Sequence, residues 1–158
     1  MTKKIKFFAI PLVVLLFSVF TGCSSDDSSN SNSSLFIKFT HNGIQYNFED
    51  PFTTTSLSKN IRYFEGSDET FIDISLWMPL VSTTGTFNIT DSPSDVSTYN
   101  ASFTLGDDLD VDADSGTITI TSVSSDYIQG TFSFSGTTFE GTPVSVTNGS
   151  FRAANIQD

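Results

Sequence analysis

The sequence predicts an all-β domain of about eight or nine short antiparallel strands. Apolar and polar residues alternate over several segments of 35–154, as expected for strands with one buried face. No apolar period of 3.6 residues continues for more than one turn. The connections are too short for the crossover helices of a parallel sheet. These observations favour an antiparallel β-sandwich or a flattened barrel, and they leave both open.

The first elements expected are the two strands of a hairpin, 35–40 and 44–48. The pair Asn42-Gly43 separates them, and a type I′ turn favours Asn-Gly because both of its central residues need positive φ. The segment 71–78 is expected to be a central strand, because apolar residues occupy both of its faces. These residues are Ile72, Ile74, Leu76 and Met78 on one face, and Phe71 and Trp77 on the other.

The remaining strands follow from alternation with Thr and Ser. Further strands are expected near 60–65, 70–78, 86–90, 99–105, 116–123, 127–135 and 143–154. Turns are expected at 53–58, 66–68, 91–94, 106–115 and 124–126. The predicted core comprises Phe39, Phe48, Ile72, Ile74, Leu76, Phe103, Ile118, Ile120, Phe132, Phe134, Val144, Val146 and Phe151.

The first 22 residues have the organisation of a bacterial signal peptide. Lys3, Lys4 and Lys6 precede the apolar stretch 7–20, which is shorter than the roughly 20 residues of a membrane-spanning helix and suits a secretory leader. We therefore expect a signal-peptide helix in 1–22. An ordinary cleaved leader and an uncleaved anchor helix are the alternatives.

Cys23 is the only cysteine, and it follows Thr21-Gly22. This segment resembles the lipobox of bacterial lipoproteins, although Phe20 stands where Leu is usual. The resemblance implies that Cys23 becomes the N-terminus and carries a diacylglyceryl group and an acyl chain such as palmitate. Two or three buried chains give lasting membrane attachment.

Residues 23–34 are expected to form a lipidated, disordered linker, because 24–34 contain no apolar side chain. Residues 35–158 would then be a single β-domain. Asp26 and Asp27 resemble the export signal of surface-displayed lipoproteins of Bacteroidetes, so we expect an outer-membrane lipoprotein on the cell surface.

The charge of the chain excludes one class of partner. The sequence contains 7 basic and 18 acidic residues. Removal of 1–22 takes away three lysines and no acidic residue, which leaves four basic residues and a net charge of −14. Nucleic acid is not expected to bind, because its phosphates would be repelled. With Cys23 as the only cysteine, we expect no intramolecular disulfide.

Three segments in the C-terminal half, 115–122, 128–135 and 143–151, occur in order after the opening hairpin 36–48. Together they resemble a family of small, uncharacterised Bacteroidetes lipoproteins that have one all-β domain behind a lipobox. The resemblance implies the same fold and anchoring. The family has no established activity and therefore implies no catalytic residue.

Asp110, Asp112 and Asp114 form the sharpest candidate for a metal site. Their spacing is similar to positions 1, 3 and 5 of calcium loops. However, Ser115 replaces the turn glycine and Thr121 replaces the bidentate glutamate. A solvated acidic connection is the alternative, and no other cofactor is expected.

Candidates for catalysis are weaker. His41 is the only histidine and is expected to lie at the surface beside a turn, with no identifiable nucleophile. Carboxylates for sugar hydrolysis would come from Glu49/Asp50, Asp68/Glu69 or Asp73. We assign no catalytic residue and expect no enzyme.

Five aromatic residues are candidates for a sugar-binding face, because their rings offer apolar area and a polar tip. They are Tyr46, Tyr63, Trp77, Tyr99 and Tyr127. The sequence therefore favours a lipid-anchored binding module for a glycan or a protein partner. A lipocalin-like carrier of a small apolar ligand and an envelope hydrolase are the alternatives. The ligand and the oligomeric state are not indicated.

Overall fold

The computed structural model describes residues 34–89, 98–107 and 109–156, which belong to one compact unit. This part of the chain is all-β, as predicted, with ten strands and one short 3₁₀ helix, η1. The strands are β1 (Phe36–His41), β2 (Ile44–Glu49), β3 (Phe52–Ser56), β4 (Ile61–Ser67), β5 (Ile72–Pro79), β6 (Gly85–Asn88), β7 (Asn100–Leu105), β8 (Leu109–Val123), β9 (Tyr127–Thr137) and β10 (Pro143–Ala154), and η1 is Leu57–Lys59.

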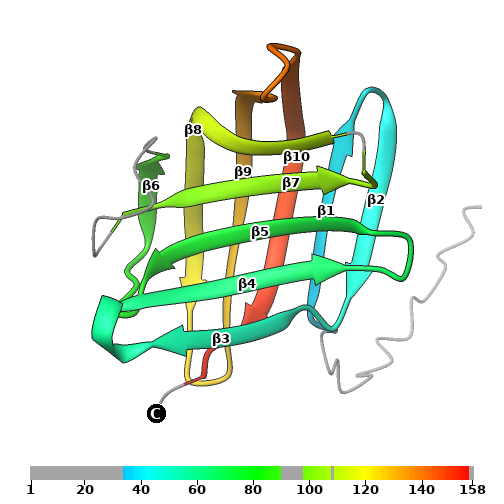
Figure 1. Ribbon diagram of the computed structural model, residues 1–158. Helices are drawn as coiled ribbons and strands as arrows, with labels where there is room; N and C mark the ends of the chain where they lie inside the picture. Colours follow the sequence, from blue (N-terminus) through cyan, green and yellow to red (C-terminus); the bar gives the residue numbers. More distant parts are fainter. Residues whose placement is uncertain (1–33, 90–97, 108, 157–158) are drawn as a thin grey trace, which may run out of the picture. The chain divides into compact units, whose positions relative to one another are not determined.

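The strands form two antiparallel layers that cross each other (Figure 1). The front sheet contains β3, β4, β5, β7 and the start of β8. The back sheet contains β6, the rest of β8, β9, β10, β1 and β2. One path, β2-β1-β10-β9-β8-β7-β5-β4-β3, runs through both layers. Because β2 and β3 are the ends of this path, the fold is a half-barrel rather than a closed one.

The strand β8 belongs to both layers. Its residues 109–112 pair with β7, whereas its later residues pair with β9. A register shift between Ala113 and Ser115 marks the change, as expected for a bulge that bends a strand. Gly116 follows with φ 149°. A Cβ atom there would lie 2.3 Å from the carbonyl oxygen of Ser133, so the bend requires glycine.

Aromatic and aliphatic side chains from both sheets fill the space between the layers. Phe39 of the back sheet meets Phe103 of the front sheet edge to face, with ring centroids 5.2 Å apart. Phe64 and Phe151 make a similar contact at 5.8 Å. The predicted core is confirmed, except that Ile72 is half-buried and packs against its margin.

Two predicted turns are wrong. The segment 53–58 is mostly strand β3 followed by η1, and β8 already begins at Leu109, inside the predicted turn 106–115. In this part of β8, Val111 and Ala113 are buried and Leu109 packs against the core, while exposed aspartates alternate with them. The run of aspartates on the outer face outweighs the short apolar alternation of the inner face, so the sequence pattern resembles a turn.

The prediction for 71–78 is correct in its central part only. β5 lies between β4 and β7, and Ile74, Leu76 and Met78 are buried. Phe71, however, lies in the β4–β5 turn with φ 58° and is 77% exposed. Trp77 is half-buried on the outer face. Only one face of this strand therefore belongs to the core.

The predicted signal peptide 1–22, Cys23 and the linker up to residue 33 lie outside the described residues. Within the residues that are described, no helix has both the length and the apolar character needed to cross a membrane.

Candidate functional site

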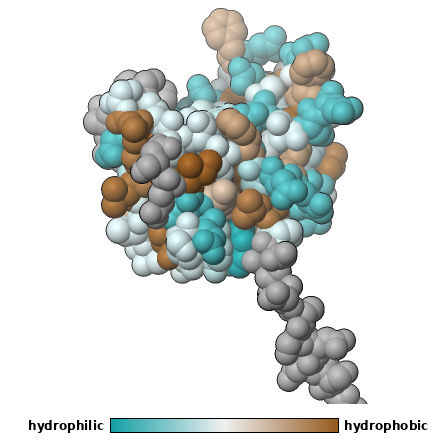
Figure 2. All heavy atoms as spheres, turned by 90° about the horizontal axis from the view of Figure 1, so that it is seen from below, coloured by the Kyte–Doolittle hydropathy of each residue, from teal (hydrophilic) through white to brown (hydrophobic). Residues whose placement is uncertain are grey.

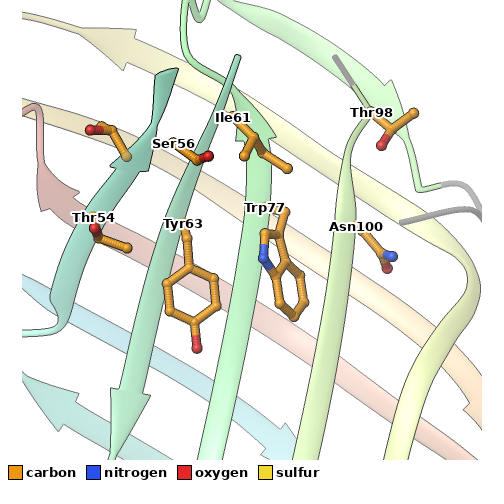
Figure 3. Close-up of a pocket in the computed structure, with 8 residues that line it drawn as sticks. Thr54, Ser56, Ile61, Tyr63, Trp77, Thr98 and Asn100 are labelled. Carbon is orange, nitrogen blue, oxygen red and sulfur yellow. The ribbon is translucent and has the colours of Figure 1, made fainter. Parts of the chain in front are cut away.

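The five aromatic candidates do not form one surface. Tyr46 stacks on Phe39 at the edge of the core, with ring centroids 5.0 Å apart. Tyr99 is buried and stacks on Phe87. The guanidinium carbon of Arg152 lies 4.4 Å from the centroid of the Tyr127 ring. Tyr63 and Trp77 remain, and these two are neighbours on the outer face of the front sheet (Figure 3).

The pairing of β4 with β5 brings Tyr63 and Trp77 together. Alternate residues of β4 point outward, and Tyr63 is one of them. The antiparallel register places Tyr63 directly opposite Trp77. The two rings are 5.1 Å apart between centroids, at an interplanar angle of 47°. Such cross-strand aromatic pairs stabilise a sheet, and here the pair also leaves ring surface facing away from the core.

A hollow with a volume of about 290 Å³ lies beside these rings. This volume is at the low end of the range for small-molecule sites. We call it the Trp77 hollow. Apart from Ile61, its other lining residues are polar and come from β3, β7 and the residues just before β7 (Figure 3). The lining residues are Thr54, Thr55, Ser56, Ile61, Tyr63, Trp77, Thr98 and Asn100.

Asn100 places a buried amide in this lining. The residue is only 3% exposed. Its Oδ1 accepts a hydrogen bond from the backbone N–H of Ala101 at 2.6 Å. Nδ2 of Asn100 is not among the buried side-chain atoms that lack a partner in the described residues. Because Asn100 lines the hollow, its amide N–H groups are suited to donate to an acceptor oxygen there.

The Tyr63 hydroxyl group is held by two neighbours. It donates a hydrogen bond to Oε2 of Glu65 on the same strand, and the Ser75 hydroxyl lies 2.9 Å away. Burial, together with the bond to Glu65, raises the pKa of Tyr63 to about 12. The phenol therefore stays protonated at neutral pH, and its ring position is fixed.

Carboxylates lie next to this network on the same outer face. The pKa of Asp73 is raised, first by burial and then by the negative charges of Glu65 and Asp110. A hydrogen bond with Thr104 opposes the shift. The ends of Glu65 and Asp73 that face solvent give the surface beside the hollow a negative potential. Cations and neutral polar molecules are therefore better suited to it than anions.

The calcium candidates lie on a strand rather than in a loop. Asp110, Asp112 and Asp114 are exposed on one face of β8, where alternate residues are spaced by roughly 6.5–7 Å. The Thr104 and Thr137 hydroxyls donate to Asp110 and Asp114 respectively. In the described part of the chain no group of three acidic, histidine or cysteine side chains could hold a metal ion. The extended strand holds these carboxylates apart, so they do not converge on one point.

His41 is buried, at 4% exposure, and the prediction of a surface position is wrong. Its Nδ1 donates to the carbonyl oxygen of Ser145 at 3.0 Å, and its Nε2 accepts from the amide of Asn42 at 3.1 Å. Its ring also packs on Phe103. The residue ends β1 with its side chain on the inner face, so it serves the packing of the hairpin.

The carboxylate pairs named for hydrolysis are separated by the fold. Glu49 is the last residue of β2 and Asp50 follows it, whereas Asp68 and Glu69 lie in the β4–β5 turn. Asp68 accepts hydrogen bonds from the backbone N–H and the hydroxyl of Thr70, which lower its pKa. Asp73 instead lies close enough to Glu65 for their charges to interact. These two carboxylates were not named together from the sequence.

Comparison with known proteins identifies a family. Residues 66–154 match the family described as "Domain of unknown function (DUF6252)". The chain belongs to this family. In the DUF6252 range lie Asp73, Trp77 and Asn100, whereas Tyr63 and Glu65 precede it. No curated protein and no solved structure matches the chain.

Sequence analysis of this DUF6252 member missed Asn100, Glu65 and Ser75 as site residues. A signal existed for Glu65, because it alternates with Tyr63 and shares its face. Asn100 gave no such signal. Its approach to Trp77 comes from the pairing of β7 with β5, and that pairing skips β6.

Proposed function

We propose that this protein is a lipid-anchored binding module of the cell envelope, attached through Cys23 to the outer membrane and displayed at the cell surface. The bound partner is a glycan, which occupies the Trp77 hollow. The observation that carries the proposal is the Tyr63–Trp77 pair beside the buried amide of Asn100.

The chemistry of the hollow suits a sugar ring. A pyranose has apolar C–H faces and a rim of hydroxyl groups. The faces pack on aromatic rings such as Trp77, and the hydroxyls accept from Nδ2 of Asn100. Threonine and serine hydroxyls of β3, both donors and acceptors, complete the lining. The adjoining carboxylates of Glu65 and Asp73 favour neutral or amine-bearing sugars over sulfated or uronic ones.

Attachment through lipid rests on the sequence. Lysines, an apolar stretch and Thr21-Gly22-Cys23 follow in the order of a lipoprotein leader. A Cys23→Ala variant should leave the membrane fraction and enter the soluble one. Its retention in the membrane would contradict the lipid anchor without bearing on the glycan site.

The packing of the interior favours a binding platform over a lipocalin-like carrier. Phe39, which is 1% exposed, contacts Phe103 across the layers and lies 6.4 Å from Phe132 between ring centroids. Side chains of this size occupy the place where a carrier would hold its ligand. The Trp77 hollow, in contrast, opens on the outer face of one sheet.

The glycan proposal is tested with the soluble fragment 34–158 on a glycan array, followed by calorimetry with the sugars that bind. Trp77→Ala should weaken binding at least tenfold, because stacking aromatics dominate such contacts (about 1.4 kcal/mol or more). Phe139→Ala is the matched control, since Phe139 is fully exposed elsewhere and its loss should change nothing.

Two outcomes would redirect the proposal. Binding that survives Trp77→Ala at full strength would show that the sugar sits elsewhere. Release of sugar from a bound glycan would favour an envelope hydrolase using Asp73 and Glu65, and Asp73→Asn should then abolish turnover while binding persists.

A further inference from the structure

One end of the β-unit carries a group of exposed apolar residues. Val81 is 78% exposed and Leu57 66%, while Val123 and Ile156 are 40% and 38% exposed. With Leu80 they surround a hollow of about 340 Å³. Figure 2 looks onto this side and shows hydrophobic residues grouped there among polar ones. We call these five residues the end patch. They come from η1, from the residues after β5, from the end of β8 and from the segment after β10.

The chain enters the β-unit at this same end. Phe36, the first residue of β1, pairs with Arg152, near the end of β10. Ala154 in turn pairs with Tyr127, next to the β8–β9 turn that follows Val123. Eleven residues, 24–34, separate Cys23 from Leu35. Fully extended they reach at most about 40 Å, so a lipid on Cys23 would keep this end within that distance of the membrane.

Charged residues of both signs lie at this end. Lys38 and Arg152 lie near strand termini there, whereas Arg62 is only 3% exposed and donates a hydrogen bond to the carbonyl oxygen of Ile156. The Lys38 ammonium lies over the Phe36 ring at 5.1 Å. Acidic residues of the β8 start and the β9–β10 turn, such as Asp112 and Glu140, lie at the far end of the back sheet. The entry end also carries negative charge, because Glu49 pairs with Phe36 and Asp126 lies in the β8–β9 turn.

We propose that the end patch seats on the lipid surface to which Cys23 is anchored, with Leu57, Val81, Val123 and Ile156 entering the headgroup region. This inference rests on the proposed lipid anchor. Exposed apolar side chains at the end where the anchored chain enters can bury their surface in the membrane interface. The anchor adds a high local concentration of lipid, so that weak contacts suffice.

A lipid surface fits the end patch better than a second copy of the chain. The linker 24–34 holds the patch within about 40 Å of the lipid surface, so that surface is present at high local concentration, whereas a second copy is not held beside the patch. The apolar residues also project from turns and strand ends rather than along a strand edge, so the patch offers no hydrogen-bonding edge for β-pairing.

The test uses a chain that begins at Cys23, coupled through its thiol to a maleimide lipid in vesicles of phosphatidylcholine and phosphatidylglycerol. Hydrogen exchange is compared with the same protein blocked at Cys23 and free in solution. The amides of 57–60 and 80–82 should exchange several-fold more slowly on vesicles, whereas those of 138–142, at the far end, should not change. The double variant Leu57→Asp/Val81→Asp should lose the protection while it stays coupled.

Equal exchange in coupled and free protein would overturn the seating, and so would slowing at 138–142 alone. Slowing at 57–60 that depends on protein density on the vesicle would assign the patch to contacts between copies and also overturn it. The natural anchor is tested separately by the mass of Cys23 in protein purified from membranes. The anchor and the seating therefore fail by different measurements.

Discussion

Gly136 of β9 lies directly against Asp112, the residue at which β8 leaves the front sheet. A Cβ atom on Gly136 would be 2.2 Å from the carbonyl oxygen of Asp112 and 2.6 Å from a methyl group of Val111. Neither neighbour is a flexible side-chain end that can yield. The crossing of the two layers therefore depends on the absence of a side chain at this position.

The first prediction is that Gly136→Ala lowers the free energy of unfolding by about 1–3 kcal/mol, because β8 must shift to admit the methyl group. Denaturant titration of the fragment 34–158 measures it. Ser133→Ala, on the exposed face of the same strand, is the control and should change stability by less than about 0.5 kcal/mol. A Gly136→Ala variant as stable as the control would contradict the tight crossing.

Phe39→Ala should cost about 3–5 kcal/mol, because it leaves a cavity between the layers where Phe39 meets Phe103. Thermal unfolding followed by circular dichroism gives the comparison. Phe139→Ala, which removes a fully exposed ring of the same kind, should leave the midpoint unchanged. Similar losses in both variants would mean that the inter-layer contact is not the source of stability.

Asp73→Asn should stabilise the protein at pH 7. Burial and the charges of Glu65 and Asp110 raise the folded-state pKa of Asp73 above its unfolded value. The folded state thus binds more protons, and stability falls as pH rises through the interval between the two pKa values. The gain from the substitution should therefore be present above this interval and disappear below it.

The measurement is the unfolding midpoint from pH 3 to pH 8. Asp112→Asn on β8 is the matched control, because that aspartate is exposed. A benefit of Asp73→Asn that is equal at both ends of the range would refute the electrostatic explanation.

Asp68→Ala should show the opposite dependence on pH. Hydrogen bonds from Thr70 lower the folded-state pKa of Asp68, so its ionised form stabilises the β4–β5 turn. This contribution is complete above the unfolded-state pKa and is lost as pH falls through the folded-state value. The wild type should exceed the variant in midpoint at pH 7, and the difference should shrink toward pH 2. Glu69→Ala, one residue along, is the control and should lack this trend.

The fold could be predicted largely from periodicity, because a strand with one buried face shows a clear alternation of apolar and polar residues. Ile118 and Ile120, or Val144 and Val146, are buried as their alternation indicates. The same logic failed where the outward face is highly charged, at Asp110–Asp114, or where threonine occupies both faces, at Thr53–Thr55. Several of the inward residues at these two places are small or polar. The apolar alternation that would indicate a strand is therefore weaker than the polar composition that indicates a turn.

The candidate site could be predicted only in part. Aromatic composition named Tyr63 and Trp77, but three other aromatics looked equivalent. What selects the pair is the register between β4 and β5, and register depends on the turn. Here the hydrogen bond to Asp68 and the left-handed conformation of Phe71 set the register, and no sequence pattern indicates that role for either residue. The approach of Asn100 depends on non-consecutive strand pairing, which alternation cannot show.

The two edge strands, β2 and β3, have a consequence for the order in which the strands could be connected along the chain. These two edges are consecutive in sequence, separated only by Asp50 and Pro51, while β1 and β10, at opposite ends of the chain, are hydrogen-bonded neighbours. A circular permutant opened at Asp50 and joined between residues 156 and 35 would meet almost every neighbour in order of synthesis. The most distant pairing would become a local one, and such a chain should fold faster than the natural one.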